Sequence, residues 1–308
     1  MTVHFSRMAV IGLGLIGGSL ALAARKAALV DRVVGCASRQ ASLDSGLALG
    51  IIDEGTLSAA DAVKGADLVF LSVPVATMPT IMAEIAPCLR PDAIVTDGGS
   101  VKQFVWQAAQ ELLPNPANFV PGHPIAGREK SGVEAAVAHL YQDHRVILTP
   151  TADNAVEAVQ RVVELWEGVG AIVEVLDIVE HDRVLAETSH LPHLLAFSLV
   201  DSLSRQGDSH DIFHYAAGGF RDFTRIASSS PVMWRDIFLH NTQATLDALT
   251  VFETGLVQFR QAMEAGDANA LMNIMTRANQ ARDYFLNLQN NHLQNNTLQQ
   301  NKEQESDQ

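Results

Sequence analysis

The sequence is poor in basic residues and in cysteine. Its 308 residues include 21 Lys and Arg against 35 Asp and Glu, which gives a formal net charge of -14 at pH 7. Nucleic acids and anionic membrane surfaces are bound by basic faces, so neither is an expected partner. Cys36 and Cys88 are too few for a disulfide framework and match no metal-ligand spacing. We therefore expect a protein of the reducing cytoplasm.

Apolar runs long enough to span a membrane are also missing. One uncharged run, residues 8–24, follows a basic residue and ends in alanines, as a short secretory signal does. A membrane span needs about 20 apolar residues, more than this run offers. Gly12, Gly14 and Gly17 would weaken a signal helix, and their spacing is typical of a nucleotide-binding turn. The run is therefore interpreted as part of a folded domain.

Residues 1–177 alternate short β-branched runs with helical stretches. Such alternation predicts a parallel sheet covered by helices on both faces, an α/β Rossmann-like doubly wound domain. The expected strands are 8–11, 32–37, 67–73, 93–96, 119–120, 145–149 and 172–176, and the expected helices are 16–28, 40–49, 77–89, 101–113 and 154–168.

Residues 178–288 are predicted to form an all-α domain. One helix, interrupted near Pro192, is expected over 178–203, and short helices around 218–227. A helix that continued from Pro231 to Ala265 would be roughly 50 Å long. Its apolar stripe is longer than a small helical domain can bury, which favours a homodimer seam over an ordinary core helix.

The segment 289–308 is rich in Gln and Asn and has little to bury. We predict that it is a disordered polar tail.

The glycine motif follows a predicted strand and opens a predicted helix, the context of a dinucleotide site. Its glycines permit a tight turn, close approach of a pyrophosphate and packing of helix on strand, while the helix N-terminus supplies N–H groups. The predicted cofactor-binding residues of this turn are Gly12, Gly14, Leu15, Ile16 and Gly17.

The end of the second predicted strand indicates which cofactor binds. NAD sites usually place Asp or Glu there for the ribose 2′-OH, but this chain has Ser38 and Arg39, while Asp31 and Asp44 are poorly placed. Arg39 can pair with a 2′-phosphate and Ser38 can add a hydroxyl contact. NADP is therefore favoured over NAD, which stays the alternative.

Three further segments follow strands at the ligand-binding edge of such a sheet. They begin at Ser72, which with Pro74 is predicted to line the cofactor site, at Asp97 and at Pro121. Ser100 is expected to cap a helix beginning at Val101. His123 lies between Gly and Pro in a short loop, which makes it a candidate proton acceptor rather than an ordinary surface histidine.

Five separated motifs carry a resemblance to a known family. They are Gly12-Leu-Gly-Leu-Ile-Gly-Gly-Ser-Leu20, Asp97-Gly-Gly-Ser-Val-Lys102, Gly122-His-Pro-Ile-Ala-Gly127, Ser189-His-Leu-Pro-His193 and Gly218-Gly-Phe-Arg-Asp-Phe-Thr-Arg-Ile-Ala227. In this order the chain resembles the prephenate/arogenate (cyclohexadienyl) dehydrogenase family of tyrosine biosynthesis, over about residues 8–288.

The resemblance implies an NAD(P)-dependent oxidative decarboxylation of a small dicarboxylate, which converts prephenate to 4-hydroxyphenylpyruvate or arogenate to tyrosine. It implies that His123 accepts from the substrate 4-hydroxyl beside Ser100, and that no metal is needed. The substrate-binding residues that it implies are His190, His193, Arg225, Gly218 and Trp234, with Glu129 and Asp222 gating the pocket and Trp234 able to reach the partner subunit's pocket in a homodimer.

Other interpretations of these residues stay open. Glu187 and His190 could begin a metal site, Arg225 could pair with Asp222, Arg221 has a weaker claim than Arg225, and Trp234 could be simple core packing.

Two other functions are also open. A β-hydroxyacid or imine reductase joins the same two kinds of domain but uses a catalytic Lys, and residues 178–288 contain none. A non-catalytic NADP sensor would bind the cofactor without turnover.

Overall fold

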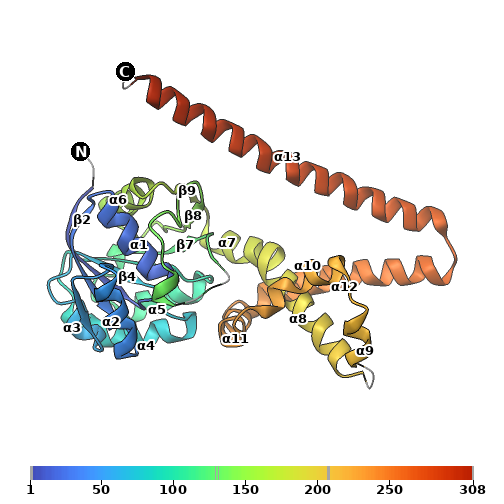
Figure 1. Ribbon diagram of the computed structural model, residues 1–308, viewed down its shortest axis with the longest axis horizontal. Helices are drawn as coiled ribbons and strands as arrows, with labels where there is room; N and C mark the ends of the chain where they lie inside the picture. Colours follow the sequence, from blue (N-terminus) through green and yellow to red (C-terminus); the bar gives the residue numbers. More distant parts are fainter. Residues whose placement is uncertain (1–2, 129, 131, 207–208, 307–308) are drawn as a thin grey trace. The chain divides into compact units, whose positions relative to one another are not determined.

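The structure is a computed structural model that describes residues 3–128, 130, 132–206 and 209–306, with the backbone alone for 209–211 and 289–306 (Figure 1). Contacts divide the chain into two compact units, one up to Thr245 and one from Leu246 onward.

The first unit is built on six parallel strands in the order β3-β2-β1-β4-β5-β6. In register, Ile11 lies beside Cys36 and Leu71, and Leu71 beside Asp97. The loops after four strands therefore leave from one edge, and the order reverses between β1 and β4, where doubly wound sheets bind ligands. The strands are β1 (Phe5–Ile11), β2 (Val30–Cys36), β3 (Glu54–Thr56), β4 (Leu68–Leu71), β5 (Ile94–Asp97) and β6 (Phe119–Val120).

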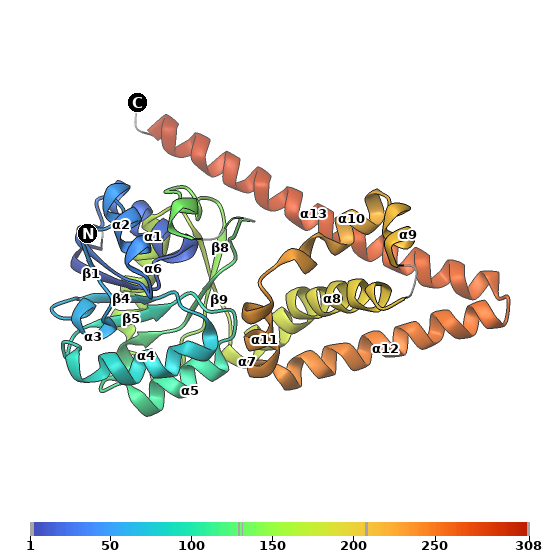
Figure 2. The same ribbon diagram turned by 60° about the horizontal axis from the view of Figure 1, so that its bottom comes forward.

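Helices cover both faces of this sheet, as the alternating pattern predicts (Figure 2). Met8 and Val10 of β1 pack into one core and Ala9 and Ile11 into the other, because successive residues of a strand point to opposite faces. The first core takes residues of α1 (Leu15–Lys26), α2 (Gln40–Ala48) and α6 (Val156–Gly168), and the second takes α3 (Ala59–Ala62), α4 (Met78–Ile85) and α5 (Gln103–Leu112).

A second, three-stranded sheet corrects two expectations. β7 (Gly122–Pro124) pairs antiparallel with β8 (Arg145–Leu148), which pairs parallel with β9 (Ile172–Val175). Residues 145–149 and 172–176 therefore do not extend the main parallel sheet. His123, expected in a loop, lies on a strand, because β7 is only three residues long and its Gly and Pro hide the strand pattern.

The helical part begins with α7 (Ile178–Leu185), a π-helical turn (Ala186–His190) and α8 (Leu191–Ser204). The interruption falls where expected, because Pro192 has no N–H to donate four residues back and its ring crowds that carbonyl. Further along lie α9 (Ser209–His214), α10 (Gly218–Thr224), a 3-10 turn (Arg225–Ser228) and α11 (Pro231–His240).

The single long helix expected from Pro231 to Ala265 is wrong. Asn241 has φ -122° and ψ 40°, so the chain forms α11 and then α12 (Thr242–Glu264). The reason is a long-range contact, because the Asn241 side chain bonds to a carbonyl and a histidine from the preceding helices. Sequence spacing does not reveal such contacts.

The unit from Leu246 holds most of α12 and all of α13 (Ala268–Ser306). Its large apolar side chains are widely exposed, for example Val251 at 75%, Met263 at 62% and Tyr284 at 66%. The helix α13 includes residues 289–306, which the sequence predicts to be disordered, and their polar composition gives a helix there no apolar face. Within the described ranges, no helix has the length and apolar character needed to cross a membrane.

Candidate active site

The glycine turn between β1 and α1 has the tight geometry that its sequence predicts. Gly12 has φ +99°, and a Cβ there would lie 2.5 Å from the Ser72 carbonyl oxygen. A Cβ on Gly17 would lie 2.6 Å from the Gly12 carbonyl oxygen, whereas one on Gly14 would meet nothing within 4 Å. The first turn of α1 carries no acidic residue, so the N–H groups from Leu15 and Ile16 onward present a positive helix end. These residues fit a nicotinamide dinucleotide.

Ser72 and Pro74 follow β4 at the same edge of the sheet. The Ser72 hydroxyl donates to the carbonyl of Gly12 at 2.7 Å. Its described role is therefore to hold the glycine turn in shape. Pro74 is exposed and precedes a 3-10 turn over Val75–Thr77.

The end of β2 has no carboxylate, in agreement with the sequence. Asp31 lies at the start of that strand beside His4, and Asp44 accepts from Gln40 within α2. Ser38 and Arg39 are exposed where β2 leads into α2.

One acid from a distant loop nevertheless lies near Arg39. Glu134 accepts from the Ser45 hydroxyl at 2.8 Å. Its own backbone N–H, Ser45 and then the Arg39 charge hold the pKa of this carboxyl below its ordinary value. The surroundings of Arg39 are therefore not purely basic.

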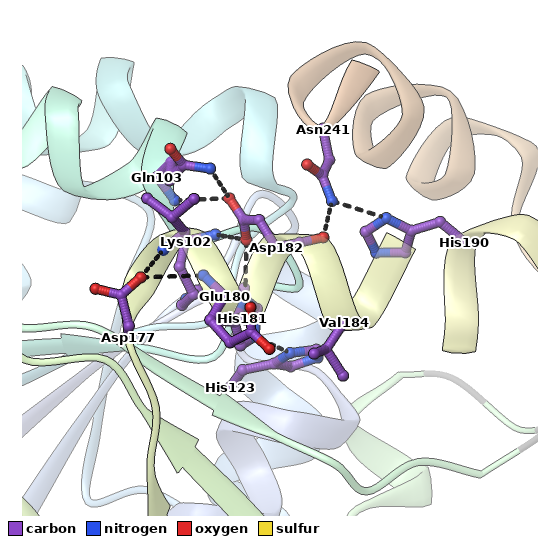
Figure 3. Close-up of polar contacts among 12 residues, drawn as sticks. Lys102, Gln103, His123, Asp177, Glu180, His181, Asp182, Val184, His190 and Asn241 are labelled. Carbon is purple, nitrogen blue, oxygen red and sulfur yellow. Dashed lines mark hydrogen bonds and ion pairs between the residues drawn. The ribbon is translucent and has the colours of Figure 1, made fainter. Parts of the chain in front are cut away.

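His123 is the end of a buried chain of polar groups (Figure 3). Its Nδ1 lies 2.9 Å from Nε2 of His181, and Nδ1 of His181 lies 2.8 Å from the Asp182 carboxylate. The same carboxylate accepts the backbone N–H groups of Lys102 at 2.8 Å and Gln103 at 3.0 Å. Asp182 thus joins the middle of α7 to the start of α5.

This chain fixes which ring nitrogens carry protons. Burial raises the pKa of Asp182, but its hydrogen bonds from His181 and from two backbone N–H groups lower it more, so the carboxyl stays ionised. A carboxylate only accepts, so His181 donates from Nδ1 and its Nε2 accepts from Nδ1–H of His123. The Nε2 atom of neutral His123 is then left without a proton, as a base must be.

Burial keeps the His123 ring neutral. It lowers the pKa of His123 well below 6.5, and electrostatic interactions with His181, Lys102 and His190 lower it further. His123 is 9% exposed, so it is buried but has a small open surface.

Ser100 does not cap α5, which corrects the sequence expectation. That helix begins at Gln103 without a side-chain cap of its own, and Asp182 bonds the N–H groups at its start instead. The Asp97 carboxylate accepts the N–H of Gly99 at 2.8 Å and of Gly122 at 3.1 Å. One side chain therefore holds the residues that directly precede Ser100 and His123.

His190 presents an unused donor in the same region. The Asn241 side-chain amide donates to the Asp182 carbonyl at 2.8 Å and lies 3.1 Å from Nδ1 of His190. Nδ1 therefore accepts and Nε2 carries the proton, yet the buried Nε2 has no partner in the described structure. An unsatisfied donor at a candidate pocket is typical of a group that a ligand completes.

The metal interpretation of Glu187 and His190 finds no support in their side chains. Glu187 is half exposed and accepts from Arg183 at 2.7 Å, whereas His190 is buried. Among the residues that the structure describes, no cluster could hold a metal ion.

His193 packs against Trp234 and interacts electrostatically with Arg225. The His193 ring stacks on Trp234 with centroids 3.7 Å apart, and its Nδ1 donates to the Ser189 carbonyl at 2.8 Å. Burial lowers the pKa of His193, and the Arg225 charge contributes. Trp234 is 5% exposed within its own chain, which agrees with core packing.

The other predicted residues lie on the surface or outside the description. Gly218 begins α10 and is exposed. Asp222 is exposed and lies 3.8 Å from Arg221, so both side chains face solvent. Glu129 lies outside the described residues.

Sequence reasoning missed His181, Asp182, Asn241 and the role of Lys102. His181 and Asp182 stand next to each other within the first helix after the last strand, a signal that could have identified them. Asn241 carries no such local signal.

Both parts of the chain match known protein families. The family model described as the prephenate dehydrogenase nucleotide-binding domain matches residues 20–175, and the one described as the prephenate dehydrogenase dimerization domain matches residues 177–277. The cyclohexadienyl dehydrogenase of Zymomonas mobilis is 41% identical over 92% of this chain and 96% of its own length. The prephenate dehydrogenase of Bacillus subtilis is 39% identical over 88% of this chain and 74% of its own.

Solved structures agree with these relatives. Aquifex aeolicus prephenate dehydrogenase in complex with hydroxyphenyl propionate and NAD+ has a TM-score of 0.87 and 38% identity, covering 92% of this chain and 100% of that one. Synechocystis arogenate dehydrogenase has a TM-score of 0.77 and 26% identity, covering 91% of this chain and 99% of that one. The chain belongs to the prephenate dehydrogenase family.

Proposed function

We propose that this chain oxidatively decarboxylates prephenate, arogenate or both with a nicotinamide cofactor, and that His123 is the base. The observation that carries the proposal is the buried Asp182–His181–His123 chain, which leaves Nε2 of His123 without a proton. Relatives named prephenate, cyclohexadienyl and arogenate dehydrogenases support the reaction class.

The proposed reaction uses Nε2 of His123 as an acceptor for the substrate 4-hydroxyl. This hydrogen bond raises electron density at C4, which helps a hydride leave that carbon. A nicotinamide dinucleotide held at the glycine turn of Gly12, Gly14 and Gly17 would supply the acceptor for that hydride. The ring carboxylate departs as CO2, and its electron pair completes the aromatic ring of the product. Ser100 is assigned to the same hydroxyl.

The two substrate carboxylates need cations or donors in an otherwise acidic chain. Arg225 is assigned to one of them because a guanidinium can bind a carboxylate through two hydrogen bonds. The unpartnered Nε2–H of His190 suits an anionic or carbonyl oxygen. His193 and Trp234 complete the wall that the substrate contacts, with Gly218 beside it, while Asp222 and Glu129 remain the predicted gate.

A reduction assay tests the function directly. The purified chain is mixed with prephenate or arogenate and with NAD or NADP, and absorbance at 340 nm is followed in all four combinations. Reduction in at least one combination is expected, and its absence from all four would refute the assignment. A sample without substrate is the control for background reduction.

The cofactor preference is a separate proposal, NADP over NAD. Its support is the missing carboxylate after β2 and the exposed Arg39 guanidinium, with Ser38 beside it. Arg39→Ala should raise KM for NADP about tenfold and leave KM for NAD nearly unchanged. The partner variant Glu134→Gln removes the nearby negative charge and should lower KM for NADP. A clear NAD preference of the native chain would contradict the proposal.

We also propose that α12 and α13 form the homodimer seam. The dimerization-domain match and the exposed apolar residues from Val251 to Tyr284 support it. Sedimentation should give twice the mass of the chain, and Leu256→Glu, at a 52% exposed position, should shift it toward monomer. A monomeric native chain would contradict this assembly.

A further inference from the structure

Lys102 is the most unusual charged residue in the described structure. It is fully buried, and its ammonium contacts the Asp97 carboxylate and donates to the Gly122 carbonyl at 2.6 Å. Lysine is almost never fully buried unless it is paired. A buried ion pair is also seldom the most stable way to fill a core, because both charges lose their hydration. The proposed chemistry, as described above, does not use this group.

The pair of Lys102 and Asp97 holds both backbone polar groups of Gly122. Lys102 takes the carbonyl of Gly122, and Asp97 takes its N–H at 3.1 Å. A Cβ on Gly122 would lie 2.9 Å from the Asp97 carbonyl oxygen, so only glycine allows this approach. β7 pairs with β8 along one edge and belongs to a different sheet from β5. The ion pair thus fastens β7 to the end of β5.

Lys102 also reaches His123 by a second path. Its backbone N–H donates to Asp182, which orients His181, which in turn bonds to Nδ1 of His123. The Lys102 side chain therefore fixes the strand that carries the histidine. Its main chain fixes Asp182, which orients the partner of the His123 ring (Figure 3).

We propose that Lys102, paired with Asp97, is a positioning residue that sets the place and the tautomer of the His123 ring. The expected effect of Lys102 on the reaction rate rests on the proposed function. Its expected effect on the position and tautomer of the ring does not. Lys102 touches no reacting atom in this arrangement. Its hydrogen bonds lead to the Nδ1 atom of His123, whereas the proposed base is the Nε2 atom on the other side of the ring.

The charge of Lys102 also affects the pKa of His123. The groups around His123 are His181 and Asp182 from α7, His190 from the π-helical turn, and Lys102 with Asp97 from the end of β5 and the loop after it. Burial lowers the pKa of His123 most, and the Lys102 charge helps. Removing that charge should therefore raise the pKa of His123 and move the acid limb of kcat/KM to higher pH.

The test uses the full chain and two independent readouts. Lys102→Met leaves Asp97 buried and unpaired, so the double variant Lys102→Met with Asp97→Asn, which removes both charges, is measured as well. Arg25→Met is the matched control, because Arg25 pairs with Asp53, whose carboxylate likewise accepts a backbone N–H, far along the chain from His123.

Nuclear magnetic resonance of 15N-labelled imidazoles is the first readout and needs no turnover. The native chain should show His123 in the single tautomer with Nε2 unprotonated, and His123→Asn assigns its signal. The Lys102 variants should show a mixture of tautomers, whereas Arg25→Met should keep the native pattern. A native tautomer in the folded double variant would overturn the proposal.

Steady-state kinetics is the second readout. A base displaced by about 1 Å can cost about 10²-fold in rate, so kcat should fall by that order in the Lys102 variants, with KM changed less than about threefold. The acid limb of kcat/KM should move to higher pH in Lys102→Met. Native kcat in the double variant would overturn the positioning role. A native chain that reduces neither cofactor refutes the proposed function, while the tautomer measurement still decides the role of Lys102.

Discussion

Helix α7 carries ionic groups on two faces whose surroundings differ. On the exposed face Arg183 bonds to Glu180 at 2.6 Å and to Glu187 at 2.7 Å, with all three side chains about half exposed. On the buried face His181 and Asp182 are 0% and 1% exposed and bond to groups from β7 and α5. The first set links residues near in sequence, and the second links segments 58 to 80 residues apart.

The difference indicates where ionic groups affect function. Exposed pairs three or four residues apart contribute little, because water and salt screen them. Buried groups lose their hydration and persist only where every hydrogen bond is made, so each change there disturbs its neighbours. The buried face of α7 should therefore control catalysis, and its exposed face should not.

The largest expected effect on kcat is at His123, the end of the buried hydrogen-bond chain that begins at Asp182. His123→Asn should lower kcat by about 10²–10⁴-fold with a smaller effect on KM, because the acceptor for the substrate hydroxyl is lost. In the native chain the acid limb of kcat/KM should lie below pH 6.5, because burial lowers the pKa of His123. Steady-state kinetics from pH 4.5 to 9 measures both. An unchanged kcat would remove His123 from its role.

The next effect compares the two faces of α7 directly. Asp182→Asn should lower kcat by about 10²-fold, because the amide no longer fixes the proton of His181 and hence of His123. Glu180→Gln, two residues earlier on the exposed face, should change kcat less than twofold. Circular dichroism checks that both variants fold. Equal effects of the two substitutions on kcat would show that the buried and exposed faces of α7 do not differ in their importance for catalysis.

A smaller effect is expected in substrate binding. Arg225→Ala should raise KM for the substrate about tenfold to hundredfold, because a charged hydrogen bond to a carboxylate is lost. KM for the cofactor should stay the same. Arg221→Ala, an exposed arginine of α10, is the matched control and should be nearly neutral. If KM for the cofactor rose instead, Arg225 would be misplaced.

The features that the sequence predicts depend on local rules. Gly12, Gly14 and Gly17 follow from the needs of one turn, and the break near Pro192 follows from its missing N–H. Alternating strands and helices predict the main sheet for the same reason, since each element is specified by its own residues.

The features that sequence reasoning misses depend on contacts between distant segments. β7 becomes a strand only because β8 lies beside it, and the helix break at Asn241 depends on Asp182 and His190. The start of α5 is capped by Asp182, about 80 residues later in the chain, and not by Ser100. Lys102 lies inside a recognised motif, yet its burial against Asp97 becomes evident only in three dimensions.

The smallest effect concerns stability and again separates the two faces. Burial lowers the pKa of His190 from 6.5 to about 4, and those of His123 and His181 are lowered too. Below pH 6.5 the unfolded chain then binds more protons than the folded one. The contribution of these histidines to the free energy of unfolding is therefore greatest above pH 6.5 and falls toward pH 4. Urea unfolding at pH 7.5 and pH 5.5 should show this loss.

His190→Gln should reduce the loss between these two pH values by about 1 kcal/mol, because one such histidine no longer takes up a proton on unfolding. Glu180→Gln should keep the native loss, because the pKa of Glu180 lies below 4.5 and its carboxyl is ionised in both states throughout this interval. A native pH dependence in His190→Gln would mean that folding does not lower the pKa of His190. At pH 5.5 the Nε2–H that we assign to the substrate would then belong to a cation, and the π-helical turn after α7 would hold a charge that its hydrogen bond to Asn241 does not indicate.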